Sequence, residues 1–266
     1  MFIDTHCHLN LEQFDTDWEQ IVAQMSEQGI RGFVVGVDAQ SSQRALMQAG
    51  RYPETLRAIV GIHPAYVTEI DDIESELDAI AEMSHNNLTV GIGECGFDFF
   101  RVLKTDSLID LQNYVFMRQV KIAHNVAKPV MIHCRPSLGQ LDAYDNVLDT
   151  LNQLRKDYPV VPHMHFFAGT VEHVASIVTM DGLCSFTGVV TFTDDYNLSI
   201  QALPVEHIVC ETDSPYVAPV PYRGERCNPL YVTKIYKAIA EQKGMPMDAF
   251  VEQVKKNVER IYCTWS

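Results

Sequence analysis

Short apolar runs rich in β-branched residues recur along the chain, and segments with helical spacing separate most of them. The eight runs span residues 2–8, 30–37, 56–62, 88–92, 129–132, 160–166, 183–190 and 207–210. Helical patterns cover residues 17–28, 41–51, 70–83, 108–126, 141–155, 230–242 and 247–262, with a weaker one over 194–203. Strands that alternate with helices in this way are typical of βαβ units around a parallel sheet. Eight such strands predict an α/β protein with the (β/α)8 architecture of a TIM barrel.

The length of the chain fits one barrel domain. It has 266 residues, and α/β barrels of roughly 200–250 residues routinely form a single domain. No glycine- or serine-rich linker, low-complexity tract or abrupt change of composition divides the sequence. We therefore expect one domain over residues 1–266.

The composition also predicts a cellular compartment. No apolar stretch approaches the ~20 residues that a membrane span requires, and the first residues lack the basic region of a secretory signal. The seven cysteines are odd in number and form no C-x-x-C pair. This usage favours buried thiols in a reducing compartment over a disulfide framework. We expect a cytoplasmic protein without a membrane association.

The charge balance limits the kind of partner that the protein can bind. The formal net charge is −15, whereas tight non-specific binding of duplex nucleic acid depends on clustered Lys and Arg. A local anionic substrate remains compatible with this balance, because the overall charge says nothing about one pocket. Five cationic residues fall in the loops that follow the predicted strands: Arg101, Lys104, Arg135, Arg223 and Arg226.

Unusual polar residues cluster at the carboxyl ends of the predicted strands. They are His6 and His8 on the first strand, His63 on the third, Glu94 on the fourth, His133 on the fifth, His165 on the sixth and Asp213 after the eighth. In a parallel barrel these strand ends converge on one mouth, where the active sites of this architecture lie. Residues spaced i, i+2 on a strand share a face, so His6 and His8 can reach one metal ion.

Imidazoles combined with carboxylates are the ligands of a catalytic zinc, iron or manganese site rather than of a structural one. Four of these five histidines, together with the two carboxylates, already exceed the needs of one ion, but two ions about 3.5–4 Å apart that share a carboxylate would use all six residues. Such a pair generates hydroxide near neutral pH and stabilises both the attacking and the leaving oxygen. The pattern therefore predicts a hydrolase.

Several positions have a structural alternative. Asp213 precedes Ser-Pro and has the pattern of a turn residue, and Glu94 lies among glycines that are typical of a surface turn. His163 and His165 are again spaced i, i+2, so their spacing alone does not choose between them. Cys7 and Cys95 adjoin the polar residues, but neighbours on a strand point to opposite faces, which predicts packing residues. Only the three-dimensional arrangement of the strands decides between the functional and the structural interpretation at each of these positions.

Six motifs, at compatible spacings along the chain, resemble those of one known family. They are IDTHCHL at 3–9, GIHP at 61–64, GIGECGFD at 91–98, IHCR at 132–135, HFFAG at 165–169 and ETDSPY at 211–216. With these motifs the sequence resembles the TatD family of metal-dependent hydrolases, within the amidohydrolase superfamily. The resemblance covers essentially the whole chain and implies the barrel fold.

The resemblance also implies a set of metal ligands. One divalent ion would bind His6, His8 and Asp213, a second would bind His133 and His165, and Glu94 would bridge the two. The resemblance selects His165 over His163, because the family histidine directly precedes an aromatic-small-Gly turn. Ligands of this kind accept zinc, manganese, magnesium or iron.

Family members are associated with deoxyribonuclease activity, often as 3′–5′ exonucleases on single strands. By resemblance, a hydroxide activated by the two ions would attack the phosphodiester phosphorus, with Glu94 and Asp213 as the catalytic carboxylates. Asp213 would orient that hydroxide or take its proton. His63 and Arg135 are candidates for phosphate contact, since Arg suits bidentate phosphate recognition. The expected partner is a nucleic acid substrate, with no obligate protein partner.

Two other functions remain open from the sequence. The same scaffold supports hydrolysis of an ester, lactone or amide outside nucleic acids, because a fold does not determine its substrate. A less favoured possibility is a metal-binding module without catalysis.

Overall fold

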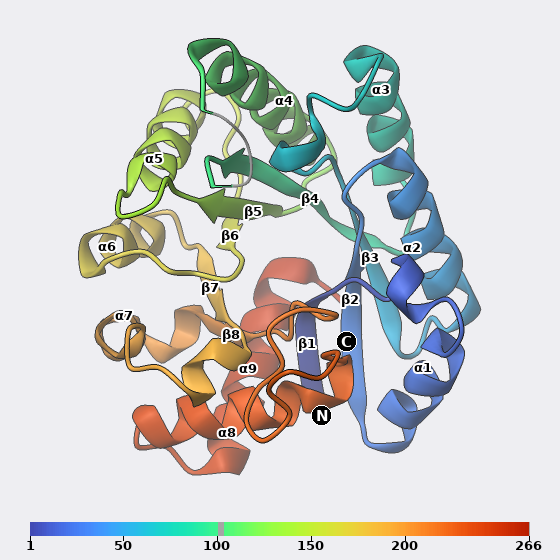
Figure 1. Ribbon diagram of the computed structural model, residues 1–266, viewed down its shortest axis with the longest axis vertical. Coiled ribbons are helices and arrows are strands. Elements are labelled where there is room, and N and C mark those ends of the chain that lie inside the picture. The colour runs from blue at the N-terminus through green and yellow to red at the C-terminus, as the bar shows by residue number, and fades with distance from the viewer. Residues whose placement is uncertain (101–103, 266) are drawn as a thin grey trace.

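Figure 1 shows the computed structural model, which describes residues 1–100 and 104–265. The strands are β1 (Phe2–Cys7), β2 (Ile30–Val35), β3 (Leu56–Val60), β4 (Thr89–Asp98), β5 (Val130–Arg135), β6 (Pro162–Met164), β7 (Leu183–Phe186) and β8 (Ile208–Cys210). The helices are α1 (Trp18–Glu27), α2 (Ala39–Arg51), α3 (Ile73–Ser84), α4 (Asp106–Asn125), α5 (Asp142–Leu154), α6 (Val171–Thr179), α7 (Asn197–Ala202), α8 (Val232–Gln242) and α9 (Met247–Tyr262).

The strands form one parallel sheet in chain order, from β1 to β8. The two ends of this sheet meet, because the Asp213 N–H donates to the His6 carbonyl oxygen at 2.9 Å and the His8 N–H donates to the Ser214 carbonyl oxygen at 2.8 Å. The sheet thereby curls into a barrel that the helices surround (Figure 1). The predicted TIM-barrel fold is confirmed.

A buried carboxylate supports the seam between β1 and the end of β8. Asp4 accepts hydrogen bonds from the N–H of Thr212 at 2.8 Å and from its hydroxyl at 2.6 Å. The Thr5 hydroxyl donates to the Cys210 carbonyl oxygen at 3.1 Å. These side-chain bonds replace part of the backbone ladder where the short strand β8 ends.

Helix α4 shows how apolar spacing places a helix against the barrel. Its buried residues recur every three or four positions, at Leu108, Gln112, Val115, Phe116, Gln119, Val120 and Ala123. This spacing is that of a helix with one buried face. At the amino end, the Thr105 side chain accepts a hydrogen bond from the Leu108 N–H, which satisfies one of the free helical N–H groups.

Two glutamines on this buried face anchor the mouth of the barrel. The Gln119 side chain accepts from the Ile62 N–H at 2.8 Å and donates to the Ile62 carbonyl oxygen at 3.1 Å. The Gln112 side chain donates to the Pro64 carbonyl oxygen at 3.0 Å. Both neighbours of His63 are therefore held by α4.

Strand β4 differs most from its prediction. The sequence predicts a strand over 88–92 that Glu94 closes, but β4 continues to Asp98, and the prediction that Glu94 lies at a strand end is wrong. The β4–β5 register shifts between Ile92 and Cys95, next to Gly93 with its φ of +134°. A Cβ atom at Gly93 would lie 2.2 Å from the Met131 carbonyl oxygen. Glycine thus permits the close strand approach that brings Glu94 into the mouth.

Other elements deviate less from the predictions. Helix α6 has no counterpart among the predicted helices. The run predicted over 160–166 forms the short strand β6, so that His165 directly follows it. The run over 183–190 is strand only to Phe186 and continues as a 3₁₀ turn, Gly188–Thr191. Among the described residues, no helix is both long and apolar enough to cross a membrane.

Candidate metal centre

The first half of the site is built from β1 and the loop after β8. His6 and His8 face the same side, with their Nε2 atoms 3.0 Å apart. The Oδ1 atom of Asp213 lies 3.7 Å from the first of these nitrogens and 3.6 Å from the second. Glu94 completes the group, its Oε2 atom 3.3 Å from His6 Nε2. All four side chains are buried or nearly so.

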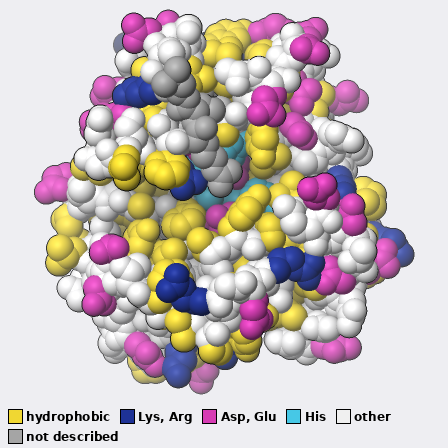
Figure 2. All heavy atoms as spheres, viewed as in Figure 1, with side chains coloured by type: hydrophobic (Ala, Val, Ile, Leu, Met, Phe, Trp, Pro, Cys, Tyr) yellow, Lys and Arg dark blue, Asp and Glu magenta, His cyan; other side chains and the backbone are white. Residues whose placement is uncertain are grey.

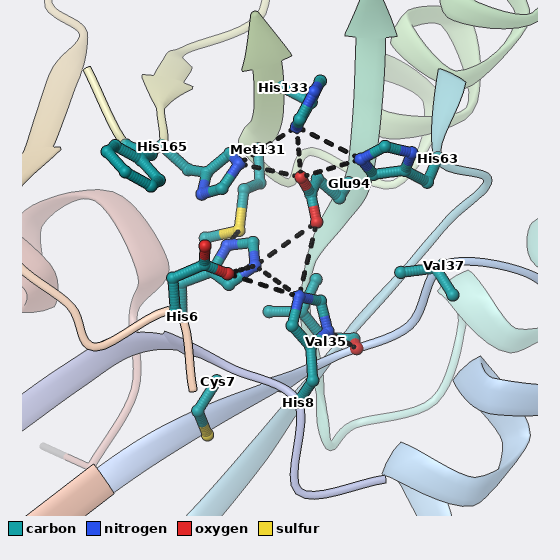
Figure 3. Close-up of polar contacts among 12 residues, drawn as sticks. His6, Cys7, His8, Val35, Val37, His63, Glu94, Met131, His133 and His165 are labelled. Atoms are coloured by element: carbon teal, nitrogen blue, oxygen red, sulfur yellow. Dashed lines mark hydrogen bonds and ion pairs between the residues drawn. The ribbon is translucent and has the colours of Figure 1, made fainter. Parts of the chain in front are cut away.

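The second half of the site is built from β4, β5 and the end of β6. Nδ1 of His133 lies 2.6 Å from Oε1 of Glu94, and Nε2 of His165 lies 2.7 Å from the same oxygen. The two oxygens of Glu94 therefore face different pairs of histidines, one on each side (Figure 3). This is the arrangement that a carboxylate shared by two ions requires.

Backbone and sulfur contacts determine which nitrogen of each first-half histidine faces the site. Nδ1 of His8 donates to the Val35 carbonyl oxygen at 2.9 Å. Nδ1 of His6 lies 3.0 Å from the Met131 sulfur. With the proton on Nδ1, each Nε2 carries a lone pair that points to the site.

Carboxylates do the same for the second-half histidines. Nε2 of His133 donates to Asp98 Oδ2 at 3.1 Å, which leaves the Nδ1 lone pair to face Glu94. Nδ1 of His165 donates to Glu211 Oε1 at 3.2 Å, which leaves its Nε2 lone pair for the site. Metal-binding histidines usually donate their second N–H in this way.

His63 has the opposite arrangement. Its Nδ1 accepts a hydrogen bond from the Ala65 N–H at 3.0 Å, so the ring proton is on Nε2. That Nε2 lies 3.4 Å from Glu94 Oε1. Burial, together with the neighbouring His133, lowers the pKa of His63 to about 4. The side chain is therefore neutral and presents an N–H group to the site, although His63, Asp98 and His133 also form a group that could hold a metal ion.

The two carboxylates of the site are ionised at neutral pH. Burial alone would raise the pKa of Glu94, but the imidazoles around it, His165 foremost, hold this pKa well below its usual range. Burial acts in the same direction on Asp213, but the neighbouring imidazoles of His8, His6 and His165 together outweigh it, so that this pKa is also lowered. Both groups are available as anionic ligands.

The structure separates the two histidines of the 163–165 pair. His163 points into the barrel interior, where its Nδ1 lies 2.5 Å from the Tyr262 hydroxyl and its Nε2 lies 2.9 Å from the Ser185 hydroxyl. Only His165 faces Glu94. The stacked ring of His6, 4.0 Å from the ring of His165 between centroids, links the two halves of the site.

The adjacent cysteines do not face the site. The buried Cys7 thiol donates to the Phe33 carbonyl oxygen at 3.3 Å and points away from the cluster (Figure 3). Cys95 is also buried, with its sulfur 3.7 Å from the Met131 carbonyl oxygen. Burial raises the pKa of both thiols well above the ordinary range. The prediction that they are packing residues is confirmed.

Sequence reasoning missed two residues of the site, Asp98 and Glu211. Both are fully buried, and Asp and Glu are almost never fully buried without a partner. A signal was present, because Glu211 precedes Asp213 by two residues and Asp98 follows Glu94 by four in an apolar strand. Even spacings of this kind place side chains on one face of a regular strand.

A pocket of about 410 Å³ opens above the cluster. Its floor consists of the histidines and carboxylates, and its walls include Arg135 and four aromatic residues, Tyr66, Phe166, Tyr196 and Tyr216. In Figure 2 the histidines lie at the bottom of the hollow in the centre of this face, with hydrophobic side chains around it. The pocket is thus polar at its base and aromatic at its rim.

The residues of the cluster fit divalent ions. Several groups of three ligand atoms lie close together, among them His6, His8 and Glu94, and Glu94, His133 and His165. The fit depends on the lone pairs of four imidazoles, each directed inward by a contact to its second nitrogen. Fold and site together define a metal-dependent hydrolase of the barrel class.

The family model of TatD related DNases matches residues 3–263. The chain belongs to this TatD related DNase family. A relative from Bacillus subtilis, named as the uncharacterized metal-dependent hydrolase YabD, is 33% identical over 265 residues, which cover 98% of this chain and 99% of that protein.

Two further relatives extend the comparison. A Pectobacterium carotovorum protein named 3′–5′ ssDNA/RNA exonuclease TatD is 29% identical over 268 residues, which cover 97% of this chain and 98% of the relative. The crystal structure of YJJV, a TatD homologue from Escherichia coli K12, superposes with a TM-score of 0.86 at 23% identity and covers 99% of this chain and 98% of that one. At this low identity, the likeness to the YJJV structure shows that the two chains share a fold.

Proposed function

We propose that this protein is a 3′–5′ exonuclease that hydrolyses phosphodiester bonds at the ends of single-stranded DNA. The observation that carries the proposal is the position of Glu94, whose two oxygens face two separate pairs of histidines. A site with two ion positions suits the in-line displacement of phosphoryl transfer. The name of the Pectobacterium relative supports both the polarity and the single-stranded substrate.

In this proposal His6, His8 and Asp213 would hold one divalent ion, His133 and His165 would hold the other, and Glu94 would serve as a ligand to both. When bound, the ions supply a nucleophile from water at neutral pH and neutralise phosphate oxygens. Zinc, manganese, magnesium and iron all suit these ligands, and availability selects among them.

Three side chains of the site would then accept the proton and bind the phosphate. Asp213 is 9% exposed and stands at the edge of the pocket, where its carboxylate can accept a proton from the attacking water. The Nε2–H of His63 points toward the same space and donates a hydrogen bond to a phosphate oxygen. Arg135, in the wall of the pocket, adds a cationic contact to the phosphate.

The aromatic rim suits one terminal nucleotide. The ring centroids of Tyr66, Phe166 and Tyr216 lie 5.6, 6.3 and 6.4 Å from those of His63, His165 and His8, respectively. With the phosphate at the floor, the base of the terminal nucleotide reaches these rings and stacks on them. Stacking tolerates all four bases, as an exonuclease requires.

The test is a substrate panel with protein that has been stripped of metal and reloaded. Magnesium, manganese, zinc and iron are each added to the metal-free protein, and an excess of EDTA serves as the control. A single-stranded oligonucleotide labelled at its 5′ end should give a descending ladder of products, and the same strand labelled at its 3′ end should release a mononucleotide at once. Turnover confined to carboxylic esters, lactones or amides would overturn the nuclease proposal.

The role of His63 has its own test. His63→Ala should lower kcat/KM about 100-fold, because the donor to the phosphate is lost. The stoichiometry of bound metal should stay unchanged, because Nε2 of His63 carries a proton. His133→Ala is the matched comparison and should lose one bound ion per chain. Loss of an ion from the His63 variant would assign this residue to the ligands instead.

We also infer that the chain acts as one domain in the cytoplasm. One parallel sheet of eight strands and one continuous hydrophobic core support the first point. The seven cysteines, all free thiols, support a reducing compartment.

A further inference from the structure

The cationic residues predicted around the mouth fall into two groups. Lys104 pairs with Asp142 and Arg226 pairs with Asp17, each at 2.5 Å, so acidic neighbours neutralise both charges. Arg101 lies outside the described residues. Arg135 and Arg223 have no carboxylate partner within residues 1–100 and 104–265 and instead lie over aromatic rings.

The stack of Arg223 on Phe192 lies outside the pocket. The guanidinium carbon of Arg223 is 3.8 Å from the centroid of the Phe192 ring, and this ring is 36% exposed. Phe192 follows the 3₁₀ turn after β7, and Arg223 lies in the loop after β8. We call Phe192 and Arg223 the outer platform.

The outer platform is joined to the pocket by the segment 216–223. Tyr216 and Val217 line the pocket, and Val220, which is 46% exposed, lies between them and Arg223 in the chain. The Val220 N–H donates to the Thr191 hydroxyl at 2.9 Å, which ties this segment to the residue before Phe192. The chain segment that lines one side of the pocket thus continues, through the exposed Val220, to the cation of the outer platform.

We propose that the outer platform binds the part of a single-stranded nucleic acid that precedes the terminal nucleotide. The inference rests on the exonuclease activity proposed above and adds a second subsite to it. With the 3′ end in the pocket, the upstream nucleotides pass over Tyr216 and Val220. A base then stacks on the exposed edge of the platform while the Arg223 guanidinium contacts a phosphate.

The charge balance favours this occupant over a protein or a membrane. A chain of net charge −15 that keeps a guanidinium unpaired beside its active-site mouth offers a local contact for an anion. The ring beneath the guanidinium adds the stacking surface that single-strand binding proteins combine with positive charge. Duplex DNA would not expose its bases to such a ring.

The experiment compares substrates that reach the outer platform with one that does not. The short substrate is the p-nitrophenyl ester of thymidine 5′-phosphate, and the long substrate is a 12-nucleotide single strand. Arg223→Ala and Phe192→Ala should each raise KM for the long strand about tenfold. KM and kcat for the nitrophenyl ester should change less than twofold, since this substrate ends at the pocket.

Three variants control for charge, ring and fold. Arg226→Ala removes a guanidinium that Asp17 already neutralises and should leave both substrates unaffected. Phe192→Tyr keeps the ring and should retain the KM of the unchanged protein, which separates stacking from a general loss of structure. Arg223→Lys keeps the charge without the planar stack and should give an intermediate KM.

The outcomes distinguish the outer platform from the proposed function. Equal losses on both substrates, or no loss on the long strand, would overturn the outer platform while the nuclease proposal stands. Fluorescence anisotropy with a labelled 12-nucleotide strand provides a readout without turnover. If the unchanged protein binds this strand through Arg223 but does not cleave it, the nuclease proposal fails and the outer platform stands. If Arg223→Ala binds as tightly as the unchanged protein, the platform fails.

Discussion

The contact at the second nitrogen of each imidazole determines whether that ring presents a lone pair or a proton to the site. Four of these rings donate to an oxygen or face a sulfur and so present a lone pair to the site, whereas His63 accepts from a backbone N–H and presents a proton. The tautomer of each ring follows from the backbone or side-chain group at its second nitrogen, not from the residue type. Five neighbouring histidines thus present two kinds of group to the site, four lone pairs and one N–H, although their side chains are chemically identical.

This reasoning makes Asp98 a positioning residue for His133. Asp98→Ala removes the acceptor that keeps the ring proton on Nε2, so either tautomer can form and the ring is free to rotate. We expect the affinity for one of two divalent ions to fall by about 10- to 100-fold, as measured by titration against a chelating indicator dye. Asp98→Asn retains an acceptor oxygen and should lose less.

The matched control for Asp98 is a second aspartate beside a histidine outside the site. Asp145 lies 4.0 Å from Nε2 of His173, with 72% of its side chain exposed. Asp145→Ala should leave both metal affinities unchanged. If Asp98→Ala also binds both ions with unchanged affinity, the contact between Asp98 and His133 has no role in metal binding.

Helix α4 acts on the site through the loop that follows β3. Gln119 pairs with both backbone groups of Ile62, next to His63, and it is fully buried. Gln119→Leu keeps the size of the side chain but leaves a buried N–H and C=O without partners. The free energy of unfolding should fall by about 1–3 kcal/mol, as measured by urea denaturation.

The same substitution should lower kcat/KM, because the loop that carries His63 loses its anchor. Gln43→Leu, at an exposed position in α2, is the control and should change neither quantity appreciably. A Gln119 variant that is less stable but fully active would show that α4 supports the fold without positioning His63.

The strands were predictable where apolar runs are continuous, because a parallel sheet covered by helices is buried on both faces. Strand β4 was not fully predictable, since glycines at 93 and 96 interrupt its pattern and their role depends on the approach of β5. Helix α6 is short, at nine residues, and was missed between two apolar runs.

The candidate ligands could be named from the sequence because the strand ends of a parallel barrel meet at one place. The hydrogen-bond partners of these ligands could not be named from the sequence. The contact between His133 and Asp98 joins β5 to a part of β4 that lies beyond the predicted strand. The preference for His165 came from family resemblance, and the structure supplies its physical reason, since His163 is occupied by Tyr262 and Ser185.

The charge distribution of the whole molecule leads to a last prediction, on the salt dependence of binding. The net charge of −15 leaves few cations to contact a polyanion. At the mouth, Arg135 and Arg223 are the two without an acidic partner within the described residues. Each phosphate contact on a single strand contributes a slope of about −0.7 to the plot of log K against log salt.

Two such contacts predict a slope of about −1.4, which corresponds to a loss of affinity of about sevenfold between 50 and 200 mM salt. The measurement is the anisotropy of a phosphorothioate strand, which resists cleavage, at a constant concentration of divalent ion. Arg223→Ala should reduce the magnitude of the slope by about 0.7, because one contact is lost, whereas Arg226→Ala should leave it unchanged. A slope steeper than about −4 would mean that further cations contact the strand and that the mouth alone does not account for binding.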